Sequence, residues 1–162
     1  MYYLSLNCLD LREMRPALKN FLRYPKPFAP LTTHVKPQEV ARIQTDGSFK
    51  SGLSRTAVLL RTLKGEDYTL CNTYFNHVNS TESEWQSVYD GIEYAVRKEQ
   101  QSVELENDNL GVVKSIIDRR SKVGSLFSDY RAMIYKQVRD LEYVGIRWIP
   151  RELNKADDIF RI

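Results

Sequence analysis

The stretch "ARIQTDGSFKSG", residues 41–52, places a single acid, Asp46, inside a segment that otherwise resembles a β-strand. Aspartate is depleted in strands, because its short polar side chain competes for the backbone hydrogen bonds of the sheet. Two interpretations are open from this stretch alone. Asp followed by Gly is a common turn signal, so Asp46 can simply begin a turn. Alternatively, the strand keeps the carboxylate for its chemistry, and the rest of the sequence has to decide.

Strand-like segments continue on the C-terminal side of this stretch. Residues 41–48, 54–62 and 67–78 form three such segments, separated by short turns around Gly52 and Gly65. Successive strands joined by short turns predict an antiparallel meander.

The later elements alternate between helix and strand. Trp85, Val88 and Ile92 share one helical stripe, which indicates an amphipathic helix after the meander. The same reasoning predicts helices at residues 80–98, 109–120, 125–142 and 154–162, and strands at residues 101–108 and 143–150. This order predicts an α/β domain with a mixed five-stranded sheet whose first three strands are the meander.

Length and composition fit one compact domain with an extension. The chain has 162 residues, of which 42% are apolar. Cys8 and Cys71 are the only cysteines, too few for a disulfide framework or a cysteine-based zinc site. The first ten residues carry neither a basic signal-peptide start nor an unbroken apolar run. We therefore expect no membrane span and a protein that is not secreted, located in the cytoplasm, or in the nucleus of a eukaryotic host.

The N-terminal part differs from the rest in charge and in proline content. The formal net charge is +3, and residues 1–40 account for all of it with six basic and three acidic residues. Four of the six prolines fall at residues 25–37, which predicts a linker or an extended strap. We divide the chain into an N-terminal extension with a proline-rich linker, residues 1–40, and a main domain, residues 41–162. Within the extension, residues 2–8 alternate as in a strand and residues 14–22 have helical spacing, which favours packing on this domain or on a protein partner.

Two acids are expected to meet at one edge of the predicted sheet. Asp46 lies near the end of the first strand, and Asp108 lies at the end of the strand that a crossover helix brings beside it. Neighbouring carboxylates in a poorly solvated site repel each other by several kcal/mol unless a cation lies between them. A metal ion is therefore the simplest explanation for the pair.

Three further acids have structural alternatives. Glu84 fits the last position of a capping box that begins at Thr81, which is the interpretation this segment favours when taken alone. Asp157 and Asp158 begin the last predicted helix, where acids favour the helix dipole. A helix cap or the helix dipole can explain each of these acids separately. Neither explains why several acids converge on one site.

Four segments of the chain resemble, in order and spacing, the four motifs of type 1 ribonuclease H domains. They are "TDGS", "STESEWQSVYDGIEYA", "VELENDNLGVV" and "WIPRELNKADDI". The resemblance is closest to the plant and archaeal branch, which has a "PRExNK" turn before the last acid. It covers residues 41–162 and implies a ribonuclease H-like catalytic domain with helices on both faces of the sheet.

The resemblance implies a catalytic and metal-binding role for one acid of each motif: Asp46, Glu84, Asp108 and Asp157. Asp158 is a rival for the last position, because its spacing from Asn154 is the more usual one. We choose Asp157 because it has the usual Ala-Asp-x-Ile context and keeps Ile159 on the core face.

The implied reaction is cleavage of the RNA strand of an RNA–DNA hybrid with two Mg²⁺ or Mn²⁺ ions. Such ions lie about 3.5–4 Å apart, activate a water molecule and stabilise the departing oxygen. Carboxylate ligands suit these hard ions better than Zn²⁺, which prefers His and Cys. Because only its 2′-hydroxyls distinguish RNA from DNA, the binding face needs hydrogen-bonding groups along the minor groove.

The resemblance also suggests where nucleic acid is contacted, and here the chain departs from the usual pattern. Ser80 and Thr81 replace two asparagines, the glycine-rich turn is shortened to "FKSG", and Arg151 lies in a loop where a histidine is usual. Basic residues between two helices form either a handle for the DNA strand or a solvated loop. The full set of expected contact residues is Gly47, Ser48, Ser80, Thr81, Asn109, Arg119, Arg120, Lys122 and Arg151.

Two other functions remain open from the sequence. The domain can be a binding or scaffolding module without catalysis, which serves a protein partner through residues 1–40. It can also be a nuclease of the same fold that acts on DNA junctions or structured RNA. A complete set of acids favours an enzyme, because a binding module has little reason to keep four mutually repelling carboxylates.

Overall fold

A computed structural model describes residues 27–161 of the chain. The strand predicted at residues 2–8 and the helix predicted at residues 14–22 lie outside the described residues. The strands are β1 (Phe28–Pro30), β2 (Ala41–Lys50), β3 (Leu53–Arg61), β4 (Asp67–Tyr74), β5 (Ser102–Asn107) and β6 (Tyr143–Trp148). The helices are α3 (Ser80–Arg97), α4 (Leu110–Ile117), α5 (Ser125–Val138) and two 3₁₀ helices, η1 (Arg151–Leu153) and η2 (Lys155–Arg161).

The strands form one mixed sheet in the order β1-β6-β5-β2-β3-β4. The antiparallel meander β2-β3-β4 is confirmed. β5 lies parallel to β2, with Thr45 opposite Asn107 as the last pair, and β6 lies parallel to β5. Because β2 and β5 are neighbours, the residues that follow this last pair, Asp46 and Asp108, come together at the same edge.

The mixed α/β sheet is confirmed, but it has six strands rather than five. The additional strand, β1, comes from the predicted proline-rich linker and pairs antiparallel with β6. Leu31, directly after β1, is buried in the hydrophobic core. Proline is tolerated here because an edge strand has one row of backbone groups that needs no partner in the sheet. The predicted extension therefore contributes to the sheet of the main domain.

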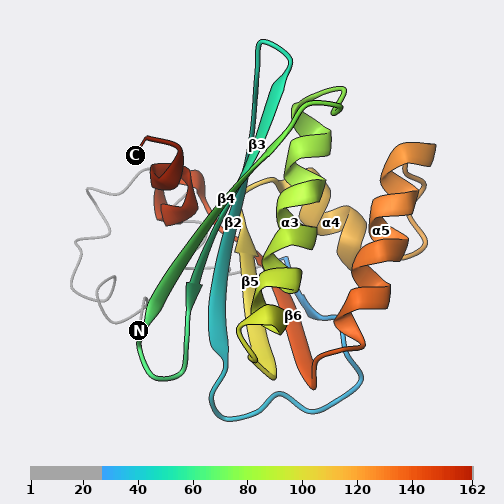
Figure 1. The fold of residues 1–162 in the computed structure, drawn as a ribbon. Helices are drawn as coiled ribbons and strands as arrows, with labels where there is room; N and C mark the ends of the chain where they lie inside the picture. Colours follow the sequence, from blue (N-terminus) through green and yellow to red (C-terminus); the bar gives the residue numbers. More distant parts are fainter. Residues whose placement is uncertain (1–26, 162) are drawn as a thin grey trace, which may run out of the picture.

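One face of the sheet carries the long helices. Figure 1 shows α3, α4 and α5 together on one side of the sheet, and the C-terminal 3₁₀ segment on the other side. Ile43, Leu105 and Ile92 are fully buried between the sheet and α3. Gly91 allows a close approach of α3, because a Cβ atom at this position would lie 2.6 Å from Cγ2 of Thr45.

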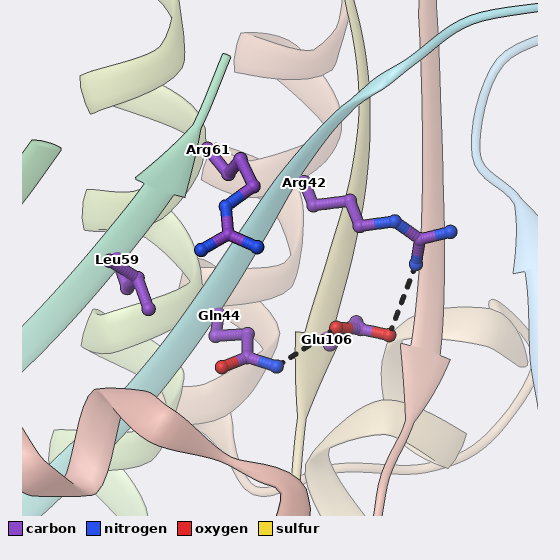
Figure 2. Close-up of a pocket in the computed structure, with 5 residues that line it drawn as sticks. All are labelled: Arg42, Gln44, Leu59, Arg61 and Glu106. Carbon is purple, nitrogen blue, oxygen red and sulfur yellow. Dashed lines mark hydrogen bonds and ion pairs between the residues drawn. The ribbon is translucent and has the colours of Figure 1, made fainter. Parts of the chain in front are cut away.

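The opposite face is polar and holds the C-terminal segment in place. Gln44 donates from Nε2 to Oε1 of Glu106 at 3.0 Å and to the carbonyl oxygen of Leu153 at 3.2 Å. Its Oε1 accepts from the backbone N–H of Lys155 at 2.8 Å. Figure 2 shows Gln44 and Arg42 directed at Glu106 from neighbouring positions on β2. These bonds fix η1 and η2 over the central strand and so position the acids of η2.

Several predicted elements differ from the structure in bounds or in type, and α5, for example, ends at Val138 rather than at residue 142. β4 ends at Tyr74, although strand composition continues to residue 78. The last segment is the 3₁₀ helix η2, whereas we predicted an α-helix at residues 154–162. The backbone N–H groups of Lys155 and Ala156 donate to the side-chain oxygens of Gln44 and Asn154, which fixes the first residues of η2.

Candidate active site

Three carboxylates from three elements converge at one edge of the sheet. Asp46 of β2, Glu84 of α3 and Asp108 after β5 each offer an oxygen, and the three oxygens lie within 4.8 Å of one another. Asp46 and Glu84 are buried, and Asp108 is half-buried. Asp46 is paired within β2 and β3, opposite Ala57, so it does not begin a turn. Asp46 therefore belongs to a cluster of acids rather than to a turn.

The N-terminal part of α3 brings Glu84 to this cluster. The helix is capped by Asn79, whose side-chain oxygen accepts from the backbone N–H of Glu82 at 2.9 Å. Glu82 makes a contact like that of a capping box, but one residue earlier, because its carboxylate accepts from the N–H of Val78, the residue before the cap, at 2.8 Å. The capping box considered at Thr81 and Glu84 is therefore wrong by two residues. Its correct position leaves the carboxylate of Glu84 free of a capping role.

Gly47 makes the approach of α3 possible. A Cβ atom on this residue would clash with the carbonyl carbon of Ser83 and would lie 2.6 Å from the backbone nitrogen of Glu84. The backbone N–H of Gly47 donates to the Asp46 carboxylate at 3.0 Å and also lowers the pKa of Glu84, which burial raises. The glycine therefore lets strand and helix touch where their acids meet.

Replacing Gly47 with Ala is expected to lower both stability and activity. The added methyl group must displace helix backbone rather than a flexible side chain, and such overpacking costs about 1–3 kcal/mol. Urea denaturation measures the loss in unfolding free energy. Gly111→Ala is the matched control, because a Cβ atom there meets only ordinary contacts and should leave stability within about 1 kcal/mol. Equal stability of the Gly47→Ala variant and the wild type would contradict the close approach.

Asn107 is a site residue that the sequence analysis missed. It is fully buried, and its Nδ2 donates to the carbonyl oxygen of Thr45 at 3.1 Å and to Oε2 of Glu84 at 3.3 Å. Asn154 complements it, donating to the same Thr45 carbonyl at 2.9 Å. These two amides tie β2, β5, α3 and the C-terminal segment together around the acids. Their positions in the sequence could have indicated this role. Asn107 directly precedes Asp108, and Asn154 lies within the "PRELNK" turn.

Burial and mutual repulsion set the protonation of the cluster. The pKa of Asp46 is raised, first by burial and then by the negative charges of Glu84 and Asp108. Burial and the charge of Asp108 raise the pKa of Glu84. Burial also raises the pKa of Asp108, although the positive charge of Arg151 opposes this effect. Without a cation the cluster therefore holds protons at a pH at which isolated carboxyls have lost them.

Asp157 lies beside this cluster, and Asp158 points away from it. The side chain of Asp157 is 20% exposed, and that of Asp158 is 62% exposed. After burial and the other carboxylates, a hydrogen bond with Asp157 further raises the pKa of Asp46. Arg161 pairs with Asp157 at 3.0 Å and approaches Asp158 at 4.0 Å. Of the two, Asp157 and not Asp158 lines the hollow that the cluster opens into.

The acids open into a hollow of about 460 Å³. Four of the expected contact residues line it: Gly47, Ser48, Asn109 and Arg151. Five do not: Ser80, Thr81, Arg119, Arg120 and Lys122. The side chain of Asn109 also caps α4, accepting from the N–H of Val112 at 3.0 Å. Arg119 stacks on Tyr135, with its guanidinium carbon 3.6 Å from the ring centre, in the connection between α4 and α5.

With this geometry in place, the chain can be compared with known proteins. Residues 44–160 match the family described as reverse transcriptase-like. The chain belongs to this reverse transcriptase-like family. The matched range contains every acid of the site. Among curated proteins, none matches the chain.

Three solved structures that are similar to this family member are ribonucleases H. RNase H1 from the halophilic archaeon Halobacterium salinarum superimposes with a TM-score of 0.68 at 15% identity, covering 75% of this chain and 93% of that one. The N-terminal RNase H domain of a Mycobacterium tuberculosis protein, fused to maltose-binding protein, gives 0.66 at 15% identity, with coverage of 75% and 93%. LC11-RNase H1 in complex with an RNA/DNA hybrid gives 0.65 at 16% identity, with coverage of 73% and 91%. These likenesses confirm the ribonuclease H-like fold.

Within residues 27–161, no helix has the length and apolar character needed to cross a membrane.

Proposed function

We propose that the chain is a metal-dependent endonuclease that hydrolyses the RNA strand of RNA–DNA hybrids. The observation that carries this proposal is the convergence of Asp46, Glu84 and Asp108 within 4.8 Å, in a fold shared with RNase H1 proteins. One of these neighbours was crystallised with an RNA/DNA hybrid, which supports the same substrate class here.

The donor set fits hard divalent cations. The three clustered ligands are carboxylates, which Mg²⁺ and Mn²⁺ accept, and no cysteine or histidine lines the hollow among the described residues. Asp46, Glu84, Asp108 and Asp157 would hold two such ions. When bound, the ions supply the positive charge that lowers the pKa of an attacking water and stabilises the leaving oxygen.

The chain's own residues supply rigidity and orientation. Asn107 holds the Glu84 carboxylate in position by donating to Oε2. The indole N–H of Trp148 donates to the carbonyl oxygen of Asp108 at 3.1 Å, which fixes the backbone of that acid. Arg151 lines the hollow beside Asp108 and places a positive charge where the anionic backbone of the substrate must enter. Ser48 lines the same hollow and offers a hydroxyl group of the kind that can meet a 2′-hydroxyl.

The proposal is tested by incubating the full chain with four end-labelled substrates: an RNA–DNA hybrid, duplex RNA, duplex DNA and a four-way DNA junction. With Mg²⁺, we expect cleavage of the RNA strand of the hybrid, leaving a 3′-hydroxyl and a 5′-phosphate, and no cleavage in EDTA. Cleavage restricted to junctions or to structured RNA would show that the chain is a nuclease with a different substrate. Binding of hybrid without cleavage under any metal condition would favour a non-catalytic module.

A further inference from the structure

The β2–β3 hairpin extends the candidate site beyond the acids. β2 and β3 remain paired as far as Lys50 opposite Leu53, and only two residues make the turn. These residues, Ser51 and Gly52, have φ values of 51° and 76°, as in the tight turns that fit twisted hairpins. The shortened "FKSG" segment is therefore an ordered end of the sheet.

Side chains of this hairpin share the face of Asp46. Alternate residues of a strand point to the same face, so Asp46, Ser48 and Lys50 lie in a row along β2. Arg55 of β3 is directly opposite Ser48. Asp46, Ser48, Lys50 and Arg55 line one and the same hollow. At about 3.3 Å per residue, Lys50 lies ~13 Å from Asp46 along the strand.

Neither cation has a carboxylate partner among the described residues, and Lys50 is exposed. Among residues 27–161, no acidic side chain lies within ion-pair distance of Lys50 or Arg55. Arg55 is half-buried, and its guanidinium carbon lies 5.1 Å from the ring centre of Phe160. Stacking on an aromatic face restricts the guanidinium but leaves its edge donors available to an anion. In contrast, Arg161 in the same hollow is paired with Asp157.

We propose that Lys50 and Arg55 bind backbone phosphates of the strand that is cut, on one side of the scissile bond. A nucleic-acid strand advances about 3.4 Å along its axis per nucleotide, so ~13 Å corresponds to about four nucleotides. The contacts therefore lie within about four nucleotides of the cut, with Arg55 nearer the acids than Lys50. This inference rests on the proposed function, because it requires a nucleic-acid strand across the acid cluster.

Salt dependence of binding measures these contacts directly. The parent is the full chain with Asp46→Asn, which prevents cleavage, and the probe is a fluorescently labelled RNA–DNA hybrid in a series of KCl concentrations. Each phosphate contact contributes about one unit to the slope of log affinity against log salt. We expect Lys50→Ala and Arg55→Ala each to reduce the slope by about 1, and the double variant by about 2. Arg55→Lys should retain the slope, because it keeps the charge.

Two cations that do not line the hollow serve as controls. Lys64 lies in the turn between β3 and β4, at the other end of the meander. Arg97 lies over the ring of Tyr94 at 5.5 Å, as Arg55 lies over Phe160, and it also approaches Glu93 at 4.0 Å. Lys64→Ala and Arg97→Ala should leave the slope unchanged.

Two results would overturn the proposal. One would leave the proposed nuclease function in place, and the other would also refute the proposed substrate. A double variant that binds hybrid with the parent's affinity and slope would refute the phosphate contacts, while cleavage by the wild type would still support the nuclease. No measurable binding of hybrid by the parent would refute the phosphate contacts together with the proposed substrate.

In the active chain, Arg55→Ala should raise KM and leave kcat within about twofold. A phosphate contact that is equally strong in the bound substrate and in the transition state affects KM alone when it is lost.

Discussion

Replacing Asp46 with Asn is expected to reduce Mg²⁺-dependent cleavage of a hybrid by at least about a thousandfold, or ~4 kcal/mol. The carboxylate lies at the centre of the cluster, and its pKa is raised by burial and by both neighbouring acids. An amide keeps the shape of the side chain but provides only a neutral ligand. Single-turnover cleavage at saturating Mg²⁺ measures the effect. If the variant retained a tenth of the wild-type rate, Asp46 would not be a metal ligand.

The same substitution is expected to stabilise the protein in the absence of metal. Because folding raises the pKa of Asp46, the unfolded chain loses this proton first, near pH 4, and the folded chain loses it at higher pH. Stability of the wild type therefore falls as pH rises from about 4 through the raised pKa of the folded state. Asn does not ionise, so the stability of the variant does not fall with pH for this reason. In EDTA, the unfolding free energy of the variant should exceed that of the wild type at pH 7.5, and the difference should shrink towards pH 4.

Urea denaturation tests this comparison, with Asp129→Asn as control. Asp129 is exposed on α5, far along the chain from the cluster, and its substitution should change neither stability nor cleavage. An inactive Asp46→Asn variant that is less stable than the wild type at pH 7.5 would indicate damage to the fold rather than loss of a ligand.

The second large effect separates Asp157 from Asp158. We expect Asp157→Asn to lose about a hundredfold in cleavage, or ~2.7 kcal/mol, and Asp158→Asn to remain within about threefold of the wild type. Adjacent residues of a 3₁₀ helix point about 120° apart, so only one of the two can face the cluster. The structure has Asp157 at 20% exposure beside Asp46 and has Asp158 at 62% exposure.

Cleavage rates at several Mg²⁺ concentrations measure both variants. Asp157→Asn should also need more Mg²⁺ for its half-maximal rate, whereas Asp158→Asn should not. The reverse order of activities would show that η2 is rotated in the active enzyme, and the assignment of the fourth acid would pass to Asp158.

The fold and the convergent acids could be predicted because their signals are local and periodic. Trp85, Val88 and Ile92 mark the buried stripe of α3, and all three are buried in the structure. The order of strands and helices then restricts the topology to a few arrangements, in which β5 lies beside β2. Asp46 and Asp108 meet for this reason.

The missed features depend on tertiary contacts. β1 has three residues and includes Pro30, so its only evidence is its pairing with β6. Asn79 and Thr81 are both acceptable helix caps, and in the structure Asn79 caps α3 while Glu82 reaches back to the N–H of Val78. In the sequence Asn107 is an ordinary residue at the end of a strand, and only the fold brings its Nδ2 to three oxygens of two residues, Thr45 and Glu84.

The central claim is that Asp46, Glu84 and Asp108 hold divalent metal ions, and anomalous diffraction from crystals of the full chain soaked in Mn²⁺ tests it most directly. The account predicts anomalous peaks among the three carboxylates, with Asp157 at the edge of the site, and no such peaks in crystals of the Asp46→Asn variant. Soaked wild-type crystals that show Mn²⁺ only at other positions, with the three carboxylates hydrogen-bonded to one another, would contradict it.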